Sequence, residues 1–285
     1  MTETTIHPTA AIADGAQLGV GVSIGPYTVV GPDVQIGDRT RVGPQVVVDG
    51  VTTIGADNQI VGQASLGTMP QDLSYNGEPT RLVIGDGNDI REFVTVNRGT
   101  VKGGGVTRVG NGCMLMACCH VAHDCEIEDR VILANNSLLA GHVHVQQGAS
   151  ISGSSAAHHF VTIGAYAYIG GMTRMSQDVP PFMLFEGHPG RVRKVNVVGL
   201  GRAGFGDEES EALRQAFRLL YRSGNPRSKS LDLLRADTTQ PEPVRLLVEA
   251  HDRIEKGVNG RYRESMREEF WRRGQALILG EGEGT

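Results

Sequence analysis

A repeat of six residues decides the fold, and it is clearest in residues 18–48, which read LGVGVS IGPYTV VGPDVQ IGDRTR VGPQVV V. The first residue of each hexapeptide in this stretch is aliphatic, and a glycine follows it in nearly every case. The frame runs unbroken over residues 6–66, returns over residues 84–96, and continues over residues 109–175 after a shift of one residue. One local pattern therefore governs most of this part of the chain.

A period of six predicts a parallel β-helix, because each hexapeptide supplies one short strand and one corner. Three hexapeptides close a triangular coil of about 18 residues, and successive coils stack at roughly the 4.8 Å spacing of paired strands. We expect the aliphatic side chains to point into the prism. We also expect the glycine-rich corners to adopt positive φ.

The composition narrows the function classes. The chain has 285 residues, with 27 Lys and Arg against 32 Asp and Glu, so no basic excess is present to bind nucleic acid. Glycine is abundant at 39 residues and aromatic residues are scarce at 5%, which favours a regular repeat over an aromatic-rich core. Neither a signal peptide nor an integral membrane segment is recognisable, so we expect a cytoplasmic protein.

All four cysteines lie between residues 113 and 125. Cys113, Cys119 and Cys125 each follow a repeat aliphatic by four residues, a slot that other repeats fill with small or β-branched residues. Because successive hexapeptides point this slot toward different faces, the three thiols cannot converge on one metal ion. We therefore expect buried structural cysteines and no metal cluster.

The period ends at Pro180 and Pro181, and the sequence then changes to helical patterns. Apolar stripes beginning at Leu213 and Val244 predict two helices, and a third is predicted over residues 264–279.

These patterns divide the chain into two parts. The first, over residues 1–190, is a β-helix with loop insertions near residues 68–81 and 97–108. The second, over residues 191–285, is a C-terminal α-helical domain whose last residues, GEGEGT, are expected to fray.

Histidines are concentrated in the late repeats: the segment from residue 120 to residue 159 contains His120, His123, His142, His144, His158 and His159. Three of them, His123, His142 and His159, follow repeat positions that lie one coil apart. We expect their imidazoles to stack along one edge of the prism.

Two chemistries use such a column. A neutral histidine can act as general base on a hydroxyl group, with Asp124 next to His123 placed to orient it. Alternatively, three histidines can hold zinc and leave a position open for water, as in a γ-type carbonic anhydrase. A non-enzymatic scaffold, in which the histidines are incidental, is a further hypothesis.

Several segments together resemble the UDP-N-acetylglucosamine 3-O-acyltransferases of lipid A biosynthesis: CHVAHDCEIEDRVILANNSLLAGHVHV (residues 119–145), QDLSYNGEPTR (71–81), VNRGT (96–100), SQDVPPF (176–182) and ALRQAFRLLYRSG (212–224). The resemblance covers nearly all of residues 6–224. It implies a left-handed parallel β-helix, mainly β with helices at the C-terminal end. It also implies a homotrimer with active sites between subunits, and no metal or other cofactor.

The implied reaction is transfer of an acyl or 3-hydroxyacyl group from acyl carrier protein to the 3-hydroxyl of UDP-N-acetylglucosamine, the first step of lipid A biosynthesis. In this resemblance His123 is the general base, Asp124 orients it, and the backbone N–H of Gly141 stabilises the oxyanion. The residues implied to contact the sugar nucleotide, acyl chain or carrier are Asp72, His120, His142, His158, His159, Asn196 and Arg202. Gly171 matches a position that limits acyl length, where glycine leaves the groove open for a long chain.

Four positions depart from the family pattern. Ser74 stands where the family usually has lysine, and His159 replaces a glutamine. Val198 and Ala203 stand where a glutamate and an arginine are common. All four concern acceptor contacts, so an N-acyltransferase acting on a 3-amino-sugar nucleotide or another amine remains an alternative.

Overall fold

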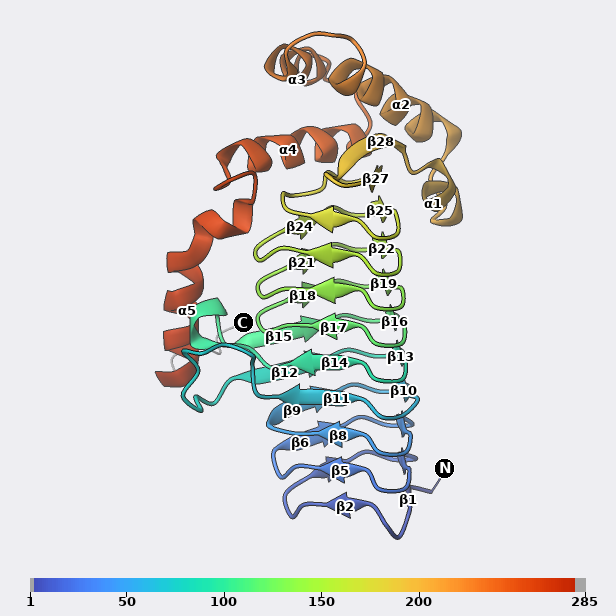
Figure 1. The fold of residues 1–285 in the computed structure, drawn as a ribbon. Coiled ribbons are helices and arrows are strands. Elements are labelled where there is room, and N and C mark those ends of the chain that lie inside the picture. The colour runs from blue at the N-terminus through green and yellow to red at the C-terminus, as the bar shows by residue number, and fades with distance from the viewer. Residues whose placement is uncertain (1–2, 280–285) are drawn as a thin grey trace.

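The computed structural model describes residues 3–279, and its main body is a triangular prism of stacked parallel strands (Figure 1). The chain visits three sheets in turn, so each strand pairs with the strand one coil later. Thr5 pairs with Ser23 and Ser23 with Arg41, a spacing of 18 residues. The repeat thus forms the parallel β-helix that its period predicts.

Sheet A contains, in spatial order, β1 (Thr5–Ile6), β4 (Ser23–Ile24), β7 (Arg41–Val42), β10 (Gln59–Ile60), β13 (Asp89–Ile90), β16 (Met114–Leu115), β19 (Ile132–Leu133), β22 (Ser150–Ile151), β25 (Tyr168–Ile169), β27 (Met183–Glu186) and β28 (Arg191–Val195). Sheet B contains β2 (Ala11–Ile12), β5 (Val29–Val30), β8 (Val47–Val48), β11 (Ser65–Thr68), β14 (Thr95–Asn97), β17 (His120–Val121), β20 (Leu138–Leu139), β23 (Ala156–Ala157) and β26 (Arg174–Met175). Sheet C contains β3 (Gln17–Leu18), β6 (Val34–Ile36), β9 (Val51–Ile54), β12 (Arg81–Ile84), β15 (Val106–Val109), β18 (Glu126–Ile127), β21 (His144–Val145) and β24 (Thr162–Ile163).

The three edges of the prism are named here by the sheets they join. The B–C edge carries the turns from sheet B to sheet C, such as residues 122–125, 140–143 and 158–161. The C–A edge carries the turns from sheet C to sheet A, such as residues 128–131 and 164–167. The A–B edge carries the remaining turns.

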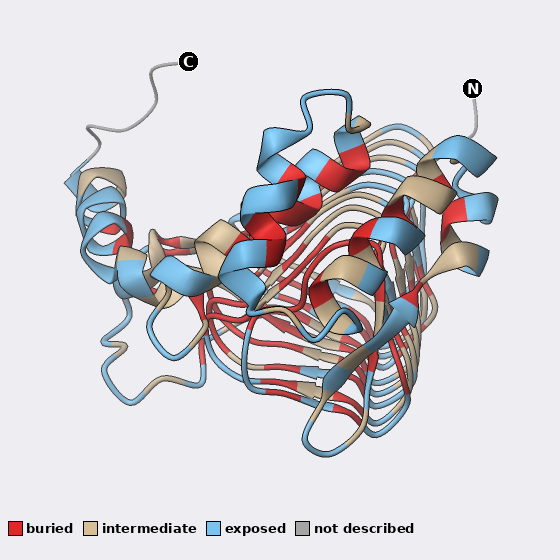
Figure 2. Ribbon diagram, turned by 90° about the horizontal axis from the view of Figure 1, so that it is seen from above, coloured by how far each residue is buried: buried red, intermediate tan, exposed pale blue. Residues whose placement is uncertain are grey.

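The core fills the inside of the prism, where buried residues recur from coil to coil (Figure 2). Most repeat aliphatics are fully buried, as at Val121 and Leu139, but in the first coil Ile6 is exposed and Ile12 and Leu18 are half-buried. Cys113, Cys119 and Cys125 are buried and unpaired, which confirms the structural interpretation of their slot. Burial raises the pKa of the Cys113 and Cys119 thiols to about 11 and that of Cys125 to about 12, so all three stay protonated.

Glycine has two roles at the corners. Where it is the third residue after the aliphatic, as at Gly21 with φ 70°, it adopts the expected positive φ. Directly after the aliphatic it does not, with the exception of Gly67, and it permits close stacking, since a Cβ on Gly43 would lie 1.8 Å from the carbonyl oxygen of Val61 in the next coil. The left-handed residue is the third after the aliphatic, and most often it is not glycine. Asp124, with φ 62°, is one example.

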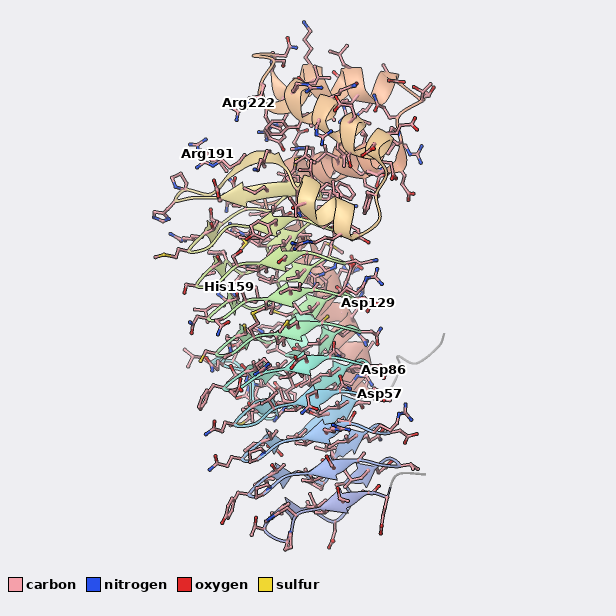
Figure 3. The ribbon with its side chains drawn as sticks, turned by 90° about the vertical axis from the view of Figure 1, so that its right-hand side faces the viewer. Asp57, Asp86, Asp129, His159, Arg191 and Arg222 are labelled. Carbon is pink, nitrogen blue, oxygen red and sulfur yellow. The ribbon has the colours of Figure 1, made fainter. Side chains whose placement is uncertain are left out.

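Aspartates bind neighbouring coils together along the C–A edge. The Oδ1 of Asp86 accepts a hydrogen bond from the N–H of Ala56 at 2.7 Å, and Oδ1 of Asp129 accepts one from Asn111 at 2.7 Å. Figure 3 shows Asp86 and Asp129 along this edge, together with Asp57.

Two insertions leave the prism at the B–C edge. Residues 69–80 follow β11, and residues 98–105 follow β14 and include the short helix η1 (Val101–Gly103). Both therefore project from the edge on which the candidate histidines lie.

The strands β27 and β28 form an antiparallel hairpin at the end of sheet A, so residues 191–195, which the sequence division assigns to the helical part, are strand. The helices that follow are α1 (Val197–Arg202), α2 (Asp207–Tyr221), α3 (Arg227–Ala236), α4 (Glu242–Lys256), η2 (Tyr262–Met266) and α5 (Arg267–Leu279). The stripes at Leu213 and Val244 correspond to α2 and α4. Helix α3 has no counterpart among the predicted helices. The last α-helix begins at Arg267 and not at residue 264, because the 3-10 helix η2 precedes it. The expected fraying of GEGEGT lies outside the described residues.

The last helix returns to the prism. From the end of α4 the chain runs back along the outside, and α5 lies beside the B–C insertions (Figure 1). The contact with η1 is close, since a Cβ on Gly274 would lie 1.9 Å from the carbonyl oxygen of Val101. Within residues 3–279 no helix combines the length and the apolarity needed to cross a membrane.

Candidate active site

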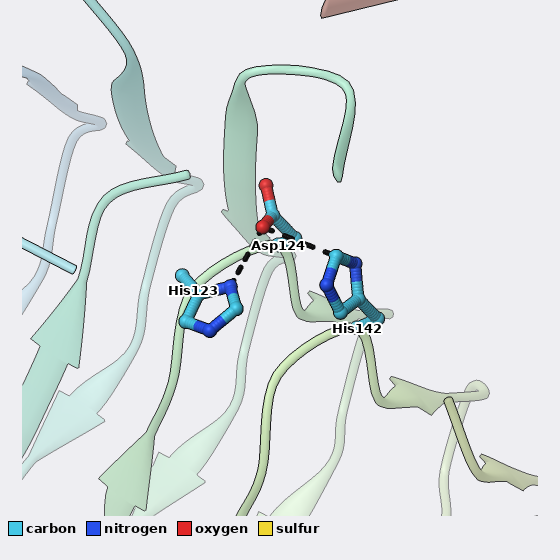
Figure 4. A group of neighbouring side chains, drawn as sticks. All are labelled: His123, Asp124 and His142. Carbon is cyan, nitrogen blue, oxygen red and sulfur yellow. Dashed lines mark hydrogen bonds and ion pairs between the residues drawn. The ribbon is translucent and has the colours of Figure 1, made fainter. Parts of the chain in front are cut away.

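His123 and Asp124 form a buried hydrogen-bonded pair on the B–C edge (Figure 4). The Oδ2 of Asp124 lies 2.7 Å from Nδ1 of His123. Thr100, at the start of η1, donates its N–H to Oδ1 at 2.7 Å and its hydroxyl to Oδ2 at 2.6 Å. The N–H of Asp124 donates to Oγ1 of Thr107 at 2.8 Å. The carboxylate is therefore fixed on several sides, and it orients His123 through Nδ1 while Nε2 remains available for chemistry.

Gly141 makes room for the His123 ring. A Cβ at this position would lie 2.5 Å from Cε1 and 2.8 Å from Nε2 of the imidazole. The N–H of Gly141 donates no hydrogen bond to any residue that the structure describes. A free backbone donor thus stands next to the candidate base, as oxyanion stabilisation requires.

His142 packs between two rings. It meets His123 edge-on, with centroids 5.2 Å apart and an interplanar angle of 89°, and it stacks on Phe160 at 4.2 Å and 6°. Its Nδ1 lies 3.9 Å from Oδ2 of Asp124, too far for a hydrogen bond, and is buried with no hydrogen-bond partner among residues 3–279. Burial lowers the pKa of His142 to about 4, so the ring is neutral near pH 7.

The expected column of His123, His142 and His159 is not formed as a continuous stack, because the ring that stacks on His142 is Phe160. His123, Gly141 and His159 share the second slot after the aliphatic residue, whereas His142 and Phe160 share the third. A side chain stacks on the one that occupies the same slot one coil away. The neighbour of His142 is therefore Phe160 and not His159.

Two further candidates are Asp72, in the first insertion, and His120, in β17. The Oδ1 of Asp72 accepts hydrogen bonds from the N–H and hydroxyl of Ser74 at 2.8 and 2.7 Å, which lower the pKa of Asp72; the His123 charge lowers it further. Nδ1 of His120 lies 2.8 Å from Oγ1 of Thr95, and burial lowers the pKa of His120.

His158 and His159 lie one coil beyond Gly141. Their rings are 5.5 Å apart and nearly perpendicular. Burial, followed by the charge of His158, lowers the pKa of His159.

Three candidates lie on other edges. Asn196 caps α1 by accepting from Gly199 and also donates to the carbonyl oxygen of Tyr166, and with Arg202 it lines a cavity of about 540 Å³ at the C–A edge. Gly171 lies on the A–B edge, exposed, where a Cβ would make only an ordinary 3.5 Å contact. Within a single subunit, Asn196, Arg202 and Gly171 therefore lie on different edges of the prism from His123.

The C-terminal segment reaches the site although no motif predicts it. Arg263 donates from Nε to the carbonyl oxygen of His142 at 3.1 Å and from Nη1 to Glu126 at 2.9 Å. Its guanidinium lies 4.9 Å from the ring of Phe270, whose own centroid is 6.5 Å from that of His142. Sequence reasoning also missed Phe160, which its position 18 residues after His142 could have revealed.

The same side chains form a cluster of possible metal ligands. One ligand atom from each of His123, Asp124 and His142 lies within 4.8 Å of the others, but His159 is not in this group. Both carboxylate oxygens of Asp124 already accept hydrogen bonds. The three-histidine arrangement of a zinc hydratase is therefore not formed by these side chains.

Comparison with known proteins identifies the family. A family model described as UDP N-acetylglucosamine O-acyltransferase, domain 2, matches residues 178–259, and the bacterial transferase hexapeptide model matches residues 15–50 and 107–141. The acyl-[acyl-carrier-protein]–UDP-N-acetylglucosamine O-acyltransferase of Thiobacillus denitrificans is 49% identical over 254 residues, covering 89% of this chain and 98% of that protein. The chain belongs to the UDP-N-acetylglucosamine O-acyltransferase family.

Solved structures of O-acyltransferases of this family have the same fold. LpxA from Acinetobacter baumannii superposes with a TM-score of 0.82 at 39% identity, covering 86% of this chain and 95% of that one. LpxA from Moraxella catarrhalis gives 0.82 at 40% identity, with the same coverage. The domain 2 model ends at residue 259, ahead of η2 and α5, so the helix that lies beside His142 is outside the matched part of this O-acyltransferase.

Proposed function

We propose that this protein transfers an acyl group from acyl carrier protein to the 3-hydroxyl of UDP-N-acetylglucosamine, the first step of lipid A biosynthesis. The names of the relatives give the substrates, and the observation that carries the proposal is the His123–Asp124 pair beside the N–H of Gly141. A thioester donor and a hydroxyl acceptor need one base and one oxyanion donor, and no cofactor.

In the proposed reaction Nε2 of His123 removes the proton from the 3-hydroxyl as that oxygen attacks the thioester carbonyl. Asp124 stabilises the imidazolium that forms, and the N–H of Gly141 donates to the oxyanion of the tetrahedral intermediate. When the intermediate collapses, the carbon–sulfur bond breaks and His123 returns the proton to the carrier thiolate. His142, neutral because of its lowered pKa, adds no competing charge to the site.

We assign substrate contacts to Asp72, His120, His142, His158 and His159 on the B–C edge. Asn196 and Arg202 are assigned to the nucleotide or the carrier, from the cavity at the C–A edge. The two edges are the two borders of sheet C. A homotrimer that sets the C–A edge of one subunit against the B–C edge of the next would unite both sets, so we propose this assembly.

The carrier is proposed to dock near the upper end of the prism, where basic side chains gather. Arg191 and Arg222 lie together there (Figure 3) and line a cavity of about 400 Å³. Acyl carrier proteins are acidic, and a basic surface on a protein of net charge −5 offers them a local partner. Carrier thioesters and sugar nucleotides are cytoplasmic metabolites, so we place the reaction in the cytoplasm.

The test is incubation of the purified protein with 3-hydroxyacyl carrier thioesters and UDP-N-acetylglucosamine or its 3-amino analogue. Mass spectrometry of the product and light scattering of the protein are the two measurements. We expect an ester at the 3-position and the mass of a trimer. Preferred turnover of the amine would replace this proposal with the N-acyltransferase alternative that Ser74 and His159 leave open. A monomeric active enzyme would contradict the shared site.

A further inference from the structure

Lys102 brings a positive charge next to Ser74, a residue of the first insertion. In the structure the ammonium of Lys102, which lies in η1 on the neighbouring insertion, donates to Oγ of Ser74 at 2.6 Å. A lysine charge is therefore present beside position 74, although it comes from a different loop.

This ammonium carries a charge that no protein group neutralises by direct contact. Within residues 3–279, Lys102 forms no ion pair with a carboxylate. Asp72 is near enough for the charge of Lys102 to lower its pKa, but the hydrogen bonds of Asp72 go to Ser74. An exposed, unpaired cation held in place by a hydroxyl group is a ready site for an anion.

A cavity lies in front of Lys102. It has a volume of about 480 Å³ and is enclosed by the two insertions on one side and by Trp271 and Gln275 of α5 on the other. Among the lining residues that the structure describes, Lys102 is the only cation and Glu78 the only carboxylate, and Glu78 accepts a hydrogen bond from the N–H of Asn76. The cavity thus presents the ammonium of Lys102, the ring of Trp271 and the amide of Gln275 to a ligand.

Hydrogen bonds lead from this cavity to Asp72: Lys102 donates to Oγ of Ser74, and the hydroxyl of Ser74 donates to Oδ1 of Asp72. The charge of His123 also lowers the pKa of Asp72, after the hydrogen bonds from Ser74. A sugar whose 3-hydroxyl sits at His123 carries its phosphate groups a few bonds away.

We propose that Lys102 binds a phosphate group of the sugar-nucleotide acceptor. The inference rests on the proposed function. Lys102 is then a specificity-determining residue supplied by the second insertion, and α5 closes the cavity in which it acts.

The experiment is a charge swap. Lys102→Gln should raise the KM for UDP-N-acetylglucosamine by roughly 10- to 100-fold with little change in kcat, because a charge-assisted contact to bound substrate is lost. Adding Ser74→Lys to Lys102→Gln should recover most of that loss. Lys256→Gln, on the exposed end of α4, is the matched control and should leave both constants unchanged.

The KM for the acyl carrier thioester identifies the source of the phosphate. If this KM rises in Lys102→Gln while that of the sugar nucleotide does not, Lys102 serves the phosphate of the carrier's prosthetic group and the assignment is overturned. Unchanged values for both substrates in a folded Lys102→Gln protein would also overturn it.

Calorimetric binding of UDP-N-acetylglucosamine to the wild type and to Lys102→Gln keeps this inference separate from the proposed reaction. Weaker binding by the variant supports Lys102 even if turnover is absent. Equal binding contradicts the assignment whatever the activity.

Discussion

The ring of Phe160 lies parallel to the imidazole of His142, with centroids 4.2 Å apart and an interplanar angle of 6°. The two residues are 18 positions apart in the sequence and share left-handed backbone angles, with φ of 66° and 65°. One coil of the prism therefore places an aromatic ring on the face of a histidine beside the candidate base. With Phe270 on α5 nearby, His142 is enclosed by apolar rings, and this burial accounts for its low pKa.

Replacing the candidate base should abolish most of the turnover. His123→Ala should reduce kcat by about 10² to 10⁴, the usual contribution of a general base, and leave the protein folded and assembled. His7→Ala, at an exposed histidine of the first coil, is the control. Near-normal activity in folded His123→Ala would exclude the assignment.

The low pKa of His142 predicts acid sensitivity of the fold. The ordinary pKa is 6.5 and the folded value is about 4, so between these values the unfolded chain binds a proton here that the folded chain does not. Stability contributed by this residue is thus complete above pH 6.5 and falls as the pH drops through 4, by about 3 kcal/mol. Urea unfolding of wild type and His142→Gln across this range measures it. The difference in unfolding free energy between the two should change with pH in that direction, and a constant difference would refute the prediction.

Opening the α5 contact should return His142 toward its ordinary pKa. Phe270 is buried against the site, and Phe270→Ala should admit water, raise the pKa of His142 and cost about 3 kcal/mol of stability. Arg272→Ala changes an exposed side chain on the same helix and should do neither. NMR titration of the His142 ring protons is the measurement, with an unshifted pKa in a folded Phe270→Ala protein as the contrary result.

Glycines after the aliphatic positions should resist substitution for steric reasons. Gly43→Ala places a Cβ against the backbone of the next coil and should destabilise the fold by about 3 kcal/mol or more. Gly201→Ala, in α1 with no atom within 4 Å of the new methyl, should be neutral or stabilising by up to about 1 kcal/mol. Thermal unfolding compares the two, and equal Tm values would show that the coils can separate to admit a methyl group.

Gly171 tests the acyl-length proposal. The backbone there is not left-handed and a Cβ meets only ordinary contact, so Gly171→Met should fold. We expect the wild type to prefer a long chain, of the 3-hydroxymyristoyl class. In the variant the methionine should block the groove and shift preference toward chains shorter by several methylenes, each worth about 0.8 kcal/mol when buried. The ratio of kcat/KM for long and short acyl carriers decides, and an unchanged ratio would remove Gly171 from this role.

The sequence by itself determined the features that repeat. The β-helix, its inward aliphatic side chains and its buried cysteines follow from the local hexapeptide pattern. This is because each strand pairs with the strand that begins 18 residues later, as β17 pairs with β20. The candidate catalytic pair was also readable, since His123 and Asp124 are adjacent in the chain. The stacking of Phe160 on His142 was also contained in the sequence, because both residues stand third after a repeat aliphatic and 18 positions apart.

Tertiary structure decided which other side chains surround the His123–Asp124 pair. Thr100 and Lys102 depend on how an insertion folds back onto the B–C edge, and Arg263 depends on the path of the chain after α4. These contacts join segments with no common period, and only long-range packing fixes their distances.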